Sequence, residues 1–537
     1  MHTRPEAPRI GFNGVVNDSA TAHIAKRRSG WAGVAGVAVS LGLTELFAGW
    51  STAVPSAISA IGGVVIDLSP SWLKTFAIST FGTADKAVLA ISIVGVALLI
   101  GWFVGKASAQ RPLPMVIAFA AAAVAGITAQ LGEPGAVAVA VIASTVAAMG
   151  AGLLTWYGIV VWSRPMERDV ADGDSAHHLP ADPGRRRLMM GLAGAVTVSA
   201  ITIWIGRSMI RSRAEAQRSA LGLPVPVERQ ADPSAANDFA LESLTPIVIP
   251  NDEFYRIDTA LVVPAVDPEE WTLTIKGMVA RDIVLTYADI AAMPLVERYV
   301  TLSCVSNEVG GGLVGNALWT GVYLKDLLDM AGVESGADQI VARSVDGWTA
   351  GFPTEIAFDG RDALLAIGMN REVLPADHGF PARLVIPGLY GYVSATKWIS
   401  ELELTTWDAF DGYWVPRGWA KEAPIKTQSR IDRPSRGATI ASGDYTLGGV
   451  AWSPTNGIER VEVQVDDGPW TDAELSKPLS NDAWLQWMLP TVFEEGEHRV
   501  RVRATDRTGF TQTEPEVQPA PDGAEGWHTI MVTAEPA

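Results

Sequence analysis

Long apolar stretches dominate the first third of the chain, whereas polar and alternating patterns dominate the rest. Five stretches approach or exceed the length of about 20 residues that a helix needs to cross a bilayer. They are residues 31–50, 86–105, 114–131, 136–162 and 188–206. A shorter apolar run, residues 55–68, predicts a re-entrant or interfacial segment. The pattern therefore predicts an N-terminal α-helical transmembrane bundle over residues 1–206.

Charges beside the apolar stretches bear on orientation. Lys26, Arg27 and Arg28 precede the first stretch and place the N-terminus in the cytoplasm. Five spans then put everything after residue 206 outside the cytoplasm, although several arginines that follow it oppose that side. The sequence PGRRRLMMGLAGAVTVSAITIWIG (183–206) resembles an internal twin-arginine export signal. A plain positively charged flank of a membrane helix explains the same residues, so both interpretations stay open.

The membrane segments offer few groups that could bind a cofactor. None of the seven histidines falls within a predicted span, which argues against a membrane haem held by two histidines. Glu45 lies within the first span, and an intramembrane carboxylate is a functional candidate by default. The sequence offers no partner for Glu45, so its role stays unassigned.

The second part of the chain changes its pattern twice. Residues 207–245 are rich in Ala, Arg and Pro, which predicts a linker. Residues 246–427 mix strand-like segments such as WTLTIKG (271–277) with helical ones such as VYLKDLLDMAGV (322–333), which predicts an α+β domain. Residues 428–537 alternate apolar and polar positions between turn signals, as in an all-β immunoglobulin-like sandwich.

Charge and cysteine content narrow the classes of function. The net charge of −18 argues against nucleic-acid binding, which needs a basic face. Cys304 is the single cysteine, so it forms no intramolecular disulfide, and no Cys/His spacing predicts a zinc site. Most unpaired cysteines are small buried hydrophobes. A chemical role for Cys304 needs either a histidine base, for which His378 is the central candidate, or a soft metal whose cofactor supplies the other ligands.

The segment DHGFPARLVIPGLYGYVSATKWISELEL (377–404) favours the metal. It holds a histidine, an arginine, a glycine-rich turn and a lysine close together in sequence. Gly388 and Gly391 let backbone N–H groups approach a phosphate, Lys397 supplies a point charge, and Arg383 supplies a planar fork. This combination suits a large anionic cofactor.

These segments resemble the sulfite-oxidase family of molybdopterin-dependent oxidoreductases. The shared sequence motifs are TLSC.SN, LW.GV.L.DLL..AGV, MN...LP.DHGFPARLVIPG..G...TKWI and a final GWH. They occur in the family's order between Pro246 and Glu535. The resemblance implies molybdenum bound by the Cys304 thiolate, by one pterin dithiolene and by oxo groups. It also implies that the terminal β domain forms a homodimer. No haem is expected in this chain, because the motif CxxCH is absent.

The resemblance also implies the remaining site residues. Cys304 is the expected metal ligand and forms the catalytic set with Trp348 and Arg256. The expected pterin and phosphate contacts are Asn251, Tyr255, Arg256, Asp346, His378, Arg383, Ser394, Ala395, Thr396 and Lys397. His498 and His528 lie in the β domain and are expected to be structural.

The chain departs from sulfite oxidases where those enzymes bind their substrate. Val309 stands where they have an arginine five residues after the cysteine, and Glu308 lies beside it. Trp348 replaces their pocket tyrosine, and Ile257 replaces an arginine of their entry motif, with Arg256 one place away. A pocket that loses cations and gains a carboxylate binds a dianion poorly. The expected substrate is therefore a neutral small molecule such as a sulfoxide or N-oxide.

The sequence thus predicts a bacterial enzyme anchored in the lipid bilayer, with its catalytic domain outside the cytoplasm, that performs two-electron oxygen-atom transfer. Electrons pass to or from a separate cytochrome or quinone system. Trp414, Trp419 and Trp484 are predicted to be exposed and are candidate docking or relay residues, although packing explains each more simply. Two alternatives stay open: a sulfite dehydrogenase that uses Arg256 or Arg417, and a non-catalytic membrane scaffold with a degenerate fold.

Overall fold

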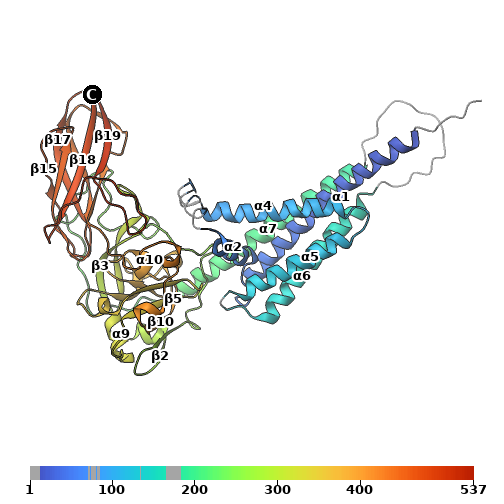
Figure 1. Cartoon of the computed structure of the whole chain (residues 1–537), viewed down its shortest axis with the longest axis horizontal. Helices are drawn as coiled ribbons and strands as arrows, with labels where there is room; N and C mark the ends of the chain where they lie inside the picture. Colours follow the sequence, from blue (N-terminus) through green and yellow to red (C-terminus); the bar gives the residue numbers. More distant parts are fainter. Residues whose placement is uncertain are drawn as a thin grey trace, which may run out of the picture. The chain divides into compact units, whose positions relative to one another are not determined.

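The computed structural model describes residues 13–70, 85–133, 135–164 and 183–536, together with Leu73, Phe76, Thr80 and Phe81. Two compact units divide the chain (Figure 1). The first unit comprises residues 1–213 with the short segment 260–262, and the second comprises residues 214–259 and 263–537. The histidines His2, His177 and His178, predicted above to lie outside the spans, are not among the described residues, whereas His23 is the first residue of the candidate membrane span His23–Trp50.

The first unit is a bundle of helices. Its members are α1 (Asn13–Trp50), α2 (Ala57–Leu68), α4 (Asp85–Ala107), α5 (Leu113–Leu131), α6 (Ala138–Trp162) and most of α7 (Pro183–Ala220). Within the described ranges, five helices are long and apolar enough to cross a membrane, namely all of these except α2. Their positions correspond to the five predicted spans, and α2 corresponds to the short apolar run at residues 55–68.

Helix α1 is the most buried of the five apolar helices, and glycines allow its close packing. A Cβ at Gly33 would lie 2.1 Å from the carbonyl oxygen of Gly101 in α4. A Cβ at Gly36 would lie 2.6 Å from the carbonyl oxygen of Gly152 in α6. Small residues let apolar helices approach until their backbones touch. These glycines therefore allow α4 and α6 to pack directly on α1.

Glu45 in α1 has partners that the sequence did not reveal. Its side chain is fully buried, and one carboxylate oxygen accepts hydrogen bonds from the Ser56 hydroxyl (2.7 Å) and from the N–H of Ile58 (3.4 Å) at the start of α2. Nε of Arg207 in α7 lies 3.7 Å from the other carboxylate oxygen. The expectation that Glu45 lacks a partner is therefore wrong, because a helix N-terminus and a cation both stabilise its charge.

Residues 207–245, predicted to be a linker, begin as helix instead. Helix α7 continues past Gly206 to Ala220, because residues 207–220 contain no Gly or Pro and are rich in Ala, Arg and other good helix formers. The irregular segment that follows, residues 221–245, belongs to the second unit and bonds to other parts of it. The Val227 N–H donates to the Leu295 carbonyl (2.8 Å), and the Asn237 amide donates to the Lys477 carbonyl (2.8 Å). This segment is therefore part of a folded unit and not a free spacer.

Two sheets form the central part of the second unit. The first has the strand order β2 (Ile283–Thr286), β1 (Thr272–Gly277), β10 (Ile399–Thr405), β5 (Gln339–Ser344) and β6 (Thr349–Pro353), and its β1–β10 pair is parallel. The second has the order β3 (Val296–Ser303), β4 (Val314–Tyr323), β7 (Leu364–Met369) and β8 (Glu372–Val373), with β9 (Arg383–Val385) also paired to β7. This second sheet is antiparallel throughout.

Short helices connect these strands. They are α8 (Tyr287–Ala291), α9 (Leu324–Ala331) and α10 (Gly391–Ser394), with 3-10 turns at Thr354–Ala357, Ala376–His378, Trp407–Ala409 and Val415–Arg417. Helix α8 begins with a capping box between Thr286 and Asp289. Helix α9 ends at Gly332, whose φ of 74° is the left-handed conformation that favours glycine. The predicted strand at 271–277 and the predicted helix ending at Gly332 are thus confirmed, in a domain richer in strands than in helices.

The C-terminal part of the second unit consists of two more sheets (Figure 1). One has the order β11 (Gln428–Arg433), β13 (Gly443–Trp452), β17 (Leu485–Phe493) and β16 (Glu474–Leu475). The other has the order β12 (Thr439–Ala441), β19 (His528–Glu535), β18 (Gly496–Asp506), β14 (Ile458–Val465) and β15 (Thr471–Asp472). Both sheets contribute to one apolar core, which includes Leu447, Trp487, Val461 and Val500. This is the two-sheet arrangement that alternating strands favour.

The central and C-terminal parts share a core. Trp452 and Trp484 are at most 1% exposed and belong to the apolar cluster of the central sheets. The Trp484 indole donates to the Ile247 carbonyl (2.9 Å), and its backbone N–H donates to the Thr301 hydroxyl (2.8 Å). The prediction that Trp484 is exposed is therefore wrong, because this residue bridges two layers of the unit. Trp414 and Trp419 are half-buried against the same cluster.

Candidate functional site

Cys304 directly follows β3 and opens the loop that leads to β4. Its N–H donates to the Leu313 carbonyl (2.9 Å), and its carbonyl accepts from the Asn307 N–H (3.0 Å). The Asn307 side chain in turn accepts from the Leu313 N–H (2.8 Å), which closes the base of the loop. The thiol is buried, and burial raises its pKa, while hydrogen bonds from Ser306 and the charge of Lys397 act in the opposite direction. The thiol thus lies within range of a buried cation.

Two buried cations come from neighbouring positions of the chain: Arg383 is the first residue of β9, and Lys397 lies on the segment between β9 and β10. Arg383 is 3% exposed and donates to the carbonyls of His378 (3.1 Å), Leu384 (3.3 Å) and Ala395 (3.5 Å). Its guanidinium also lies 4.9 Å from the centre of the Trp319 ring. Burial lowers the pKa of Arg383 to about 10. The Arg383 guanidinium, whose partners among the described residues are carbonyls and an aromatic ring, can therefore still bind an anion.

Lys397 is the second buried cation. Its ammonium lies 3.0 Å from the Asp258 carboxylate and donates to the Asp377 carbonyl (3.0 Å). Burial lowers the pKa of Lys397 to about 8, with the neighbouring charge of Arg383 adding to the effect and Asp258 opposing it. Of these two cations, Lys397 pairs with a buried carboxylate, whereas Arg383 pairs with none among the described residues.

Arg256 lies at the edge of this cluster. Its guanidinium pairs with the Asp258 carboxylate (3.0 Å) and with the Asp377 carboxylate (2.9 Å), and its side chain is about one-third exposed. Tyr255, its neighbour in the chain, stacks on Phe254 with ring centres 5.1 Å apart. Burial and the nearby Cys304 raise the pKa of Tyr255, while Arg383 lowers it. Tyr255 is therefore close to both the thiol and the buried arginine.

His378 is held at one ring nitrogen and unpaired at the other. Its Nε2 lies 2.7 Å from the Asn251 carbonyl oxygen and so carries the proton, and Phe254 packs edge-on at 5.5 Å. Burial and the charge of Lys397 lower the pKa of His378 to about 4, so the ring is neutral at physiological pH. Nδ1 is buried without a hydrogen-bond partner among the described residues. The Asn251 amide donates to Met369 O (3.3 Å) and to Glu372 (3.2 Å).

The loop after α10 brings Ser394, Ala395 and Thr396 beside Arg383. The Ser394 hydroxyl donates within its own loop, to the carbonyls of Leu389 (3.1 Å) and Tyr390 (3.0 Å). The Thr396 hydroxyl is fully buried and has no hydrogen-bond partner among the residues that the structure describes. Of the three, Thr396 alone has a free hydroxyl for a bound group.

Asp346 and Trp348 lie in the turn between β5 and β6. Burial and the neighbouring Asp258 raise the pKa of Asp346, whose carboxylate accepts from the Trp348 N–H (3.2 Å). Asp346 is thereby linked to the charged cluster. The Trp348 side chain is half-buried, and no hydrogen bond or ring contact connects it with Cys304 in the described part of the chain. Its assignment to the catalytic set therefore stays a prediction.

Sequence reasoning missed Asp258, Asp377 and Trp319 as members of the site. Asp258 pairs with both Arg256 and Lys397, and Asp377 pairs with Arg256. Trp319 carries the Arg383 guanidinium on its ring. The aspartates lie close in sequence to predicted cations, which was the available signal, but the pairing across the chain exists only in the fold.

The residues around Cys304 match the needs of a metal-bearing anionic cofactor. In the described ranges no group of three His, Cys, Asp or Glu side chains could hold a metal alone, so a metal at Cys304 needs ligands from its cofactor. The unpaired Nδ1 of His378 and Oγ1 of Thr396 accompany the two buried cations. Buried polar atoms are normally hydrogen-bonded. The unpaired atoms are therefore available to a bound polar group, and the buried Arg383, which pairs with no carboxylate among the described residues, suits a negatively charged one.

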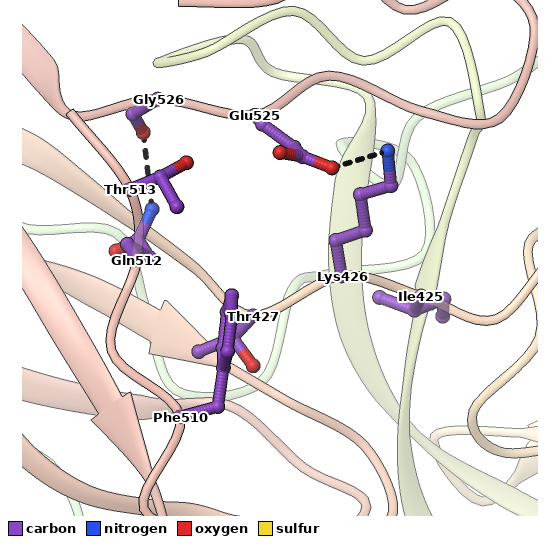
Figure 2. A pocket seen from close by; sticks show the side chains of 8 residues that line it. All are labelled: Ile425, Lys426, Thr427, Phe510, Gln512, Thr513, Glu525 and Gly526. Atoms are coloured by element: carbon purple, nitrogen blue, oxygen red, sulfur yellow. Dashed lines mark hydrogen bonds and ion pairs between the residues drawn. The ribbon is translucent and has the colours of Figure 1, made fainter. Parts of the chain in front are cut away.

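A separate pocket of about 170 Å³ lies in the C-terminal part (Figure 2). It is lined by Ile425, Lys426, Thr427, Phe510, Gln512, Thr513, Glu525 and Gly526. Lys426 pairs with Glu525 (2.7 Å) across it, and the Gln512 amide donates to the Gly526 carbonyl (3.1 Å) (Figure 2). None of the predicted site residues lines this pocket, so it is distinct from the Cys304 cluster.

Comparison with known proteins agrees with this chemistry. Residues 260–414 match the model of the oxidoreductase molybdopterin binding domain, and residues 420–534 match that of the Mo-co oxidoreductase dimerisation domain. Human mitochondrial sulfite oxidase is 28% identical over 344 residues, which cover 54% of this chain and 62% of the human protein. The uncharacterized oxidoreductase YuiH of Bacillus subtilis is 33% identical over 153 residues, which cover 28% of this chain and 74% of that protein.

Among solved structures, the sulfane dehydrogenase SoxCD of Paracoccus pantotrophus matches with a TM-score of 0.47 and 24% identity, over 56% of this chain and 85% of that one. The matched domains define the class of protein as a molybdopterin-dependent oxidoreductase, and hence an enzyme. Within that class, the chain belongs to the sulfite-oxidase family. The chain spans less than two-thirds of the length of human sulfite oxidase.

Proposed function

We propose that the protein is a membrane-anchored molybdenum-cofactor oxidoreductase that transfers one oxygen atom to or from a small molecule. One observation carries this proposal: the single cysteine, the buried Arg383 and Lys397, and two unpaired buried polar atoms lie in one cluster. A scaffold with a degenerate fold would have no reason to keep the buried Arg383 without a carboxylate partner among the described residues, because its desolvation is costly.

The residues of the cluster have distinct roles in this proposal. When bound, the molybdenum centre supplies a two-electron couple for oxygen-atom transfer. The Cys304 side chain binds the metal as a thiolate, and Lys397 stabilises that charge through space. Arg383 and Lys397 bind the negative charge of the pterin phosphate, and Thr396 donates a hydrogen bond to it. His378, neutral and oriented by the Asn251 carbonyl, presents Nδ1 as an acceptor for a pterin N–H.

The substrate is proposed to be a neutral oxide such as a sulfoxide or N-oxide. Glu308 is exposed and Val309 is half-buried on the loop that starts at Cys304. The nearest predicted replacement for the missing arginines, Arg256, already pairs with two carboxylates. Arg417 lies 3.6 Å above the Tyr413 ring and donates to the Tyr413 carbonyl. A cation compensated by carboxylates binds a dianion weakly, so Arg256 provides little attraction for sulfite, whereas Arg417 keeps the sulfite alternative open.

Sulfite oxidation is the second candidate, because sulfite oxidases are among the relatives that match this chain. Substitution at position 309 separates the two candidates. Val309→Arg restores the guanidinium of sulfite oxidases, and Val309→Leu changes size without charge. Under the proposal, wild-type enzyme reduces a sulfoxide or N-oxide faster than it oxidises sulfite. Val309→Arg then raises kcat/KM for sulfite at least tenfold, and Val309→Leu does not. Rapid sulfite oxidation by the wild type would replace the proposal with the second candidate.

The five apolar helices support the proposal that the enzyme is anchored in a bacterial cell membrane, with the catalytic unit outside the cytoplasm. Replacing Arg185, Arg186 and Arg187 by lysine keeps the positive flank of α7 but removes a twin-arginine signal. Protease accessibility in spheroplasts measures whether the catalytic unit lies outside the cytoplasm. If the catalytic unit of this variant is no longer accessible to the protease, the arginines act as an export signal. Unchanged accessibility leaves the arginines as a simple topology flank.

Two partners complete the proposal. The matched dimerisation domain supports a homodimer through the C-terminal part of the chain, which sedimentation of the purified enzyme in detergent tests directly. Electrons are proposed to come from or go to a separate cytochrome or quinone system. Steady-state reduction of a soluble cytochrome and of a quinone analogue by the same preparation distinguishes these two acceptors.

A further inference from the structure

The loop that starts at the reactive cysteine, residues 304–313, is closed at its base and held at its tip by different parts of the chain. At the base, the N–H of Cys304 donates to the Leu313 carbonyl (2.9 Å). Within the loop, the Gly311 N–H donates to the Glu308 carbonyl (2.9 Å). The tip consists of Gly310 and Gly311 and directly follows Glu308 and Val309, the two positions expected to select the substrate.

Arg430, in strand β11 of the C-terminal part, holds one side of the tip. Its Nη1 donates to the Gly311 carbonyl (2.9 Å), and its Nη2 donates to the Thr245 hydroxyl (2.8 Å). Nε donates to the Asp432 carboxylate (2.5 Å), and the side chain is 10% exposed. The guanidinium is planar, so three fixed partners determine where its contact with the loop lies.

His528, in strand β19, holds the other side of the tip. Its Nδ1 accepts from the Ile431 N–H (2.9 Å), which fixes the ring and leaves its opposite edge facing the loop. Gly310 has a φ of +75°, and a Cβ there would lie 2.2 Å from Nε2 and Cδ2 of His528. The ring therefore lies directly against the backbone of the loop, where a side chain at position 310 would clash with it.

We propose that Arg430 and His528 are positioning residues of the active site. They fix the tip of the 304–313 loop, and through it the placement of the Cys304 thiolate and of the Glu308 and Val309 side chains. The C-terminal β domain thereby sets substrate selectivity in addition to its matched role in dimerisation. This inference rests on the proposed function in taking Cys304 as the metal ligand and Glu308 and Val309 as the positions that select the substrate, whereas the contacts with the loop exist without the cofactor.

Chemical labelling of the thiol tests the mechanical part of the proposal. Cys304 is the single cysteine and is buried, so alkylation of the native full-length apoprotein by iodoacetamide reports the opening of this loop alone. Arg430→Gln should raise the alkylation rate about tenfold or more, the factor expected for a lost hydrogen bond from a charged group. Arg433→Gln is the matched control, because Arg433 lies on the same strand and bonds to the carbonyls of Thr446 and Glu242. The control should label at the wild-type rate.

Two comparisons exclude a merely structural role. The urea midpoint of Arg430→Gln should match that of Arg433→Gln, so that faster labelling reflects local and not global opening. In the cofactor-loaded enzyme, Arg430→Gln should change the Mo(V) electron paramagnetic resonance signal and the ratio of kcat/KM for sulfoxide to that for sulfite by at least threefold. His528→Gln, which keeps an acceptor for the Ile431 N–H but removes the ring from Gly310, should show the same direction of change.

Three outcomes would overturn the proposal. Arg430→Gln could label as slowly as Arg433→Gln, or its faster labelling could be matched by an equal loss of global stability. The loop could also open while the spectrum and the selectivity ratio stay at wild-type values. None of these results resembles failure of the proposed function, which would show as absent molybdenum in wild-type protein while the labelling comparison still gives its answer.

Discussion

Replacing Lys397 by methionine should separate cofactor binding from stability. The ammonium is buried beside one carboxylate, Asp258, and one carbonyl, that of Asp377, with Arg383 and Arg256 nearby. Burial lowers its pKa from 10.5 to about 8. At about 1.36 kcal/mol per pKa unit, keeping Lys397 charged in the folded apoprotein costs about 3 kcal/mol at neutral pH.

The sign of this contribution gives a pH test. Below pH 8 both the folded and the unfolded chain carry the proton, so the full cost is present. Between pH 8 and 10.5 the folded chain releases the proton first, and the stability of the wild-type apoprotein rises with pH. Lys397→Met removes this rise. At pH 7 the variant is free of the cost of burying a charge at position 397, but it also loses the bonds of Lys397 to Asp258 and Asp377. Its free energy of unfolding should therefore be equal to or above that of wild type.

Cofactor binding should change in the opposite direction. Loss of one hydrogen bond from a charged group weakens binding by about 1.5–3 kcal/mol, or about tenfold to a hundredfold. Molybdenum per chain after purification measures the binding, and urea titration of apoprotein in detergent at pH 7 and pH 9.5 measures the stability. Lys426→Met is the control, because Lys426 pairs with Asp522 and Glu525 away from the site. Full molybdenum in Lys397→Met, or a loss of stability of more than about 2 kcal/mol, would refute the reasoning.

Three further predictions concern His378, the Glu45–Arg207 pair and Trp484. Burial lowers the pKa of His378 to about 4, so wild type should lose up to about 3 kcal/mol as the pH falls from 6.5 to 4, and His378→Gln should lose less in urea titrations; equal acid sensitivity would contradict this. Arg207→Ala leaves the buried Glu45 carboxylate with the N-terminus of α2 as its stabilising partner, so the free energy of unfolding in detergent should fall by about 1–3 kcal/mol, more than for Glu45→Gln; the partial exposure of Arg207 keeps this loss moderate. Trp484→Ala should cost about 3–5 kcal/mol, whereas Trp484→Phe should keep normal turnover; slow electron transfer in a stable Trp484→Phe enzyme would show that the indole is a relay after all.

Patterns that depend on neighbouring residues could be predicted from the sequence. The five long apolar helices follow from runs of apolar side chains, and the strands of the C-terminal part follow from alternation. The end of α9 at Gly332 follows from the left-handed conformation that glycine adopts easily. The grouping of Cys304 with Arg383 and Lys397 came from family resemblance, because their separation along the chain gives no physical signal of contact.

Contacts between distant residues account for what the sequence could not show. Glu45 obtains its cation from Arg207, and Arg383 obtains its ring contact from Trp319, each from a separate part of the chain. The helical start of the predicted linker is a different case. Residues 207–220 have strong helix propensity, and the linker was predicted there from their polarity alone. The contact of His528 with Gly310 also depends on the packing of the C-terminal part against the central sheets.

The measurement that tests the central claim most directly is X-ray absorption at the molybdenum edge, on purified wild type and on Cys304→Ser. Cys304 is the single cysteine, so no other thiolate of the chain can replace it. The account predicts molybdenum in the wild type with one more sulfur ligand than any metal retained by Cys304→Ser. An identical sulfur count in both proteins, or no molybdenum in wild type from a host that makes the cofactor, would contradict it.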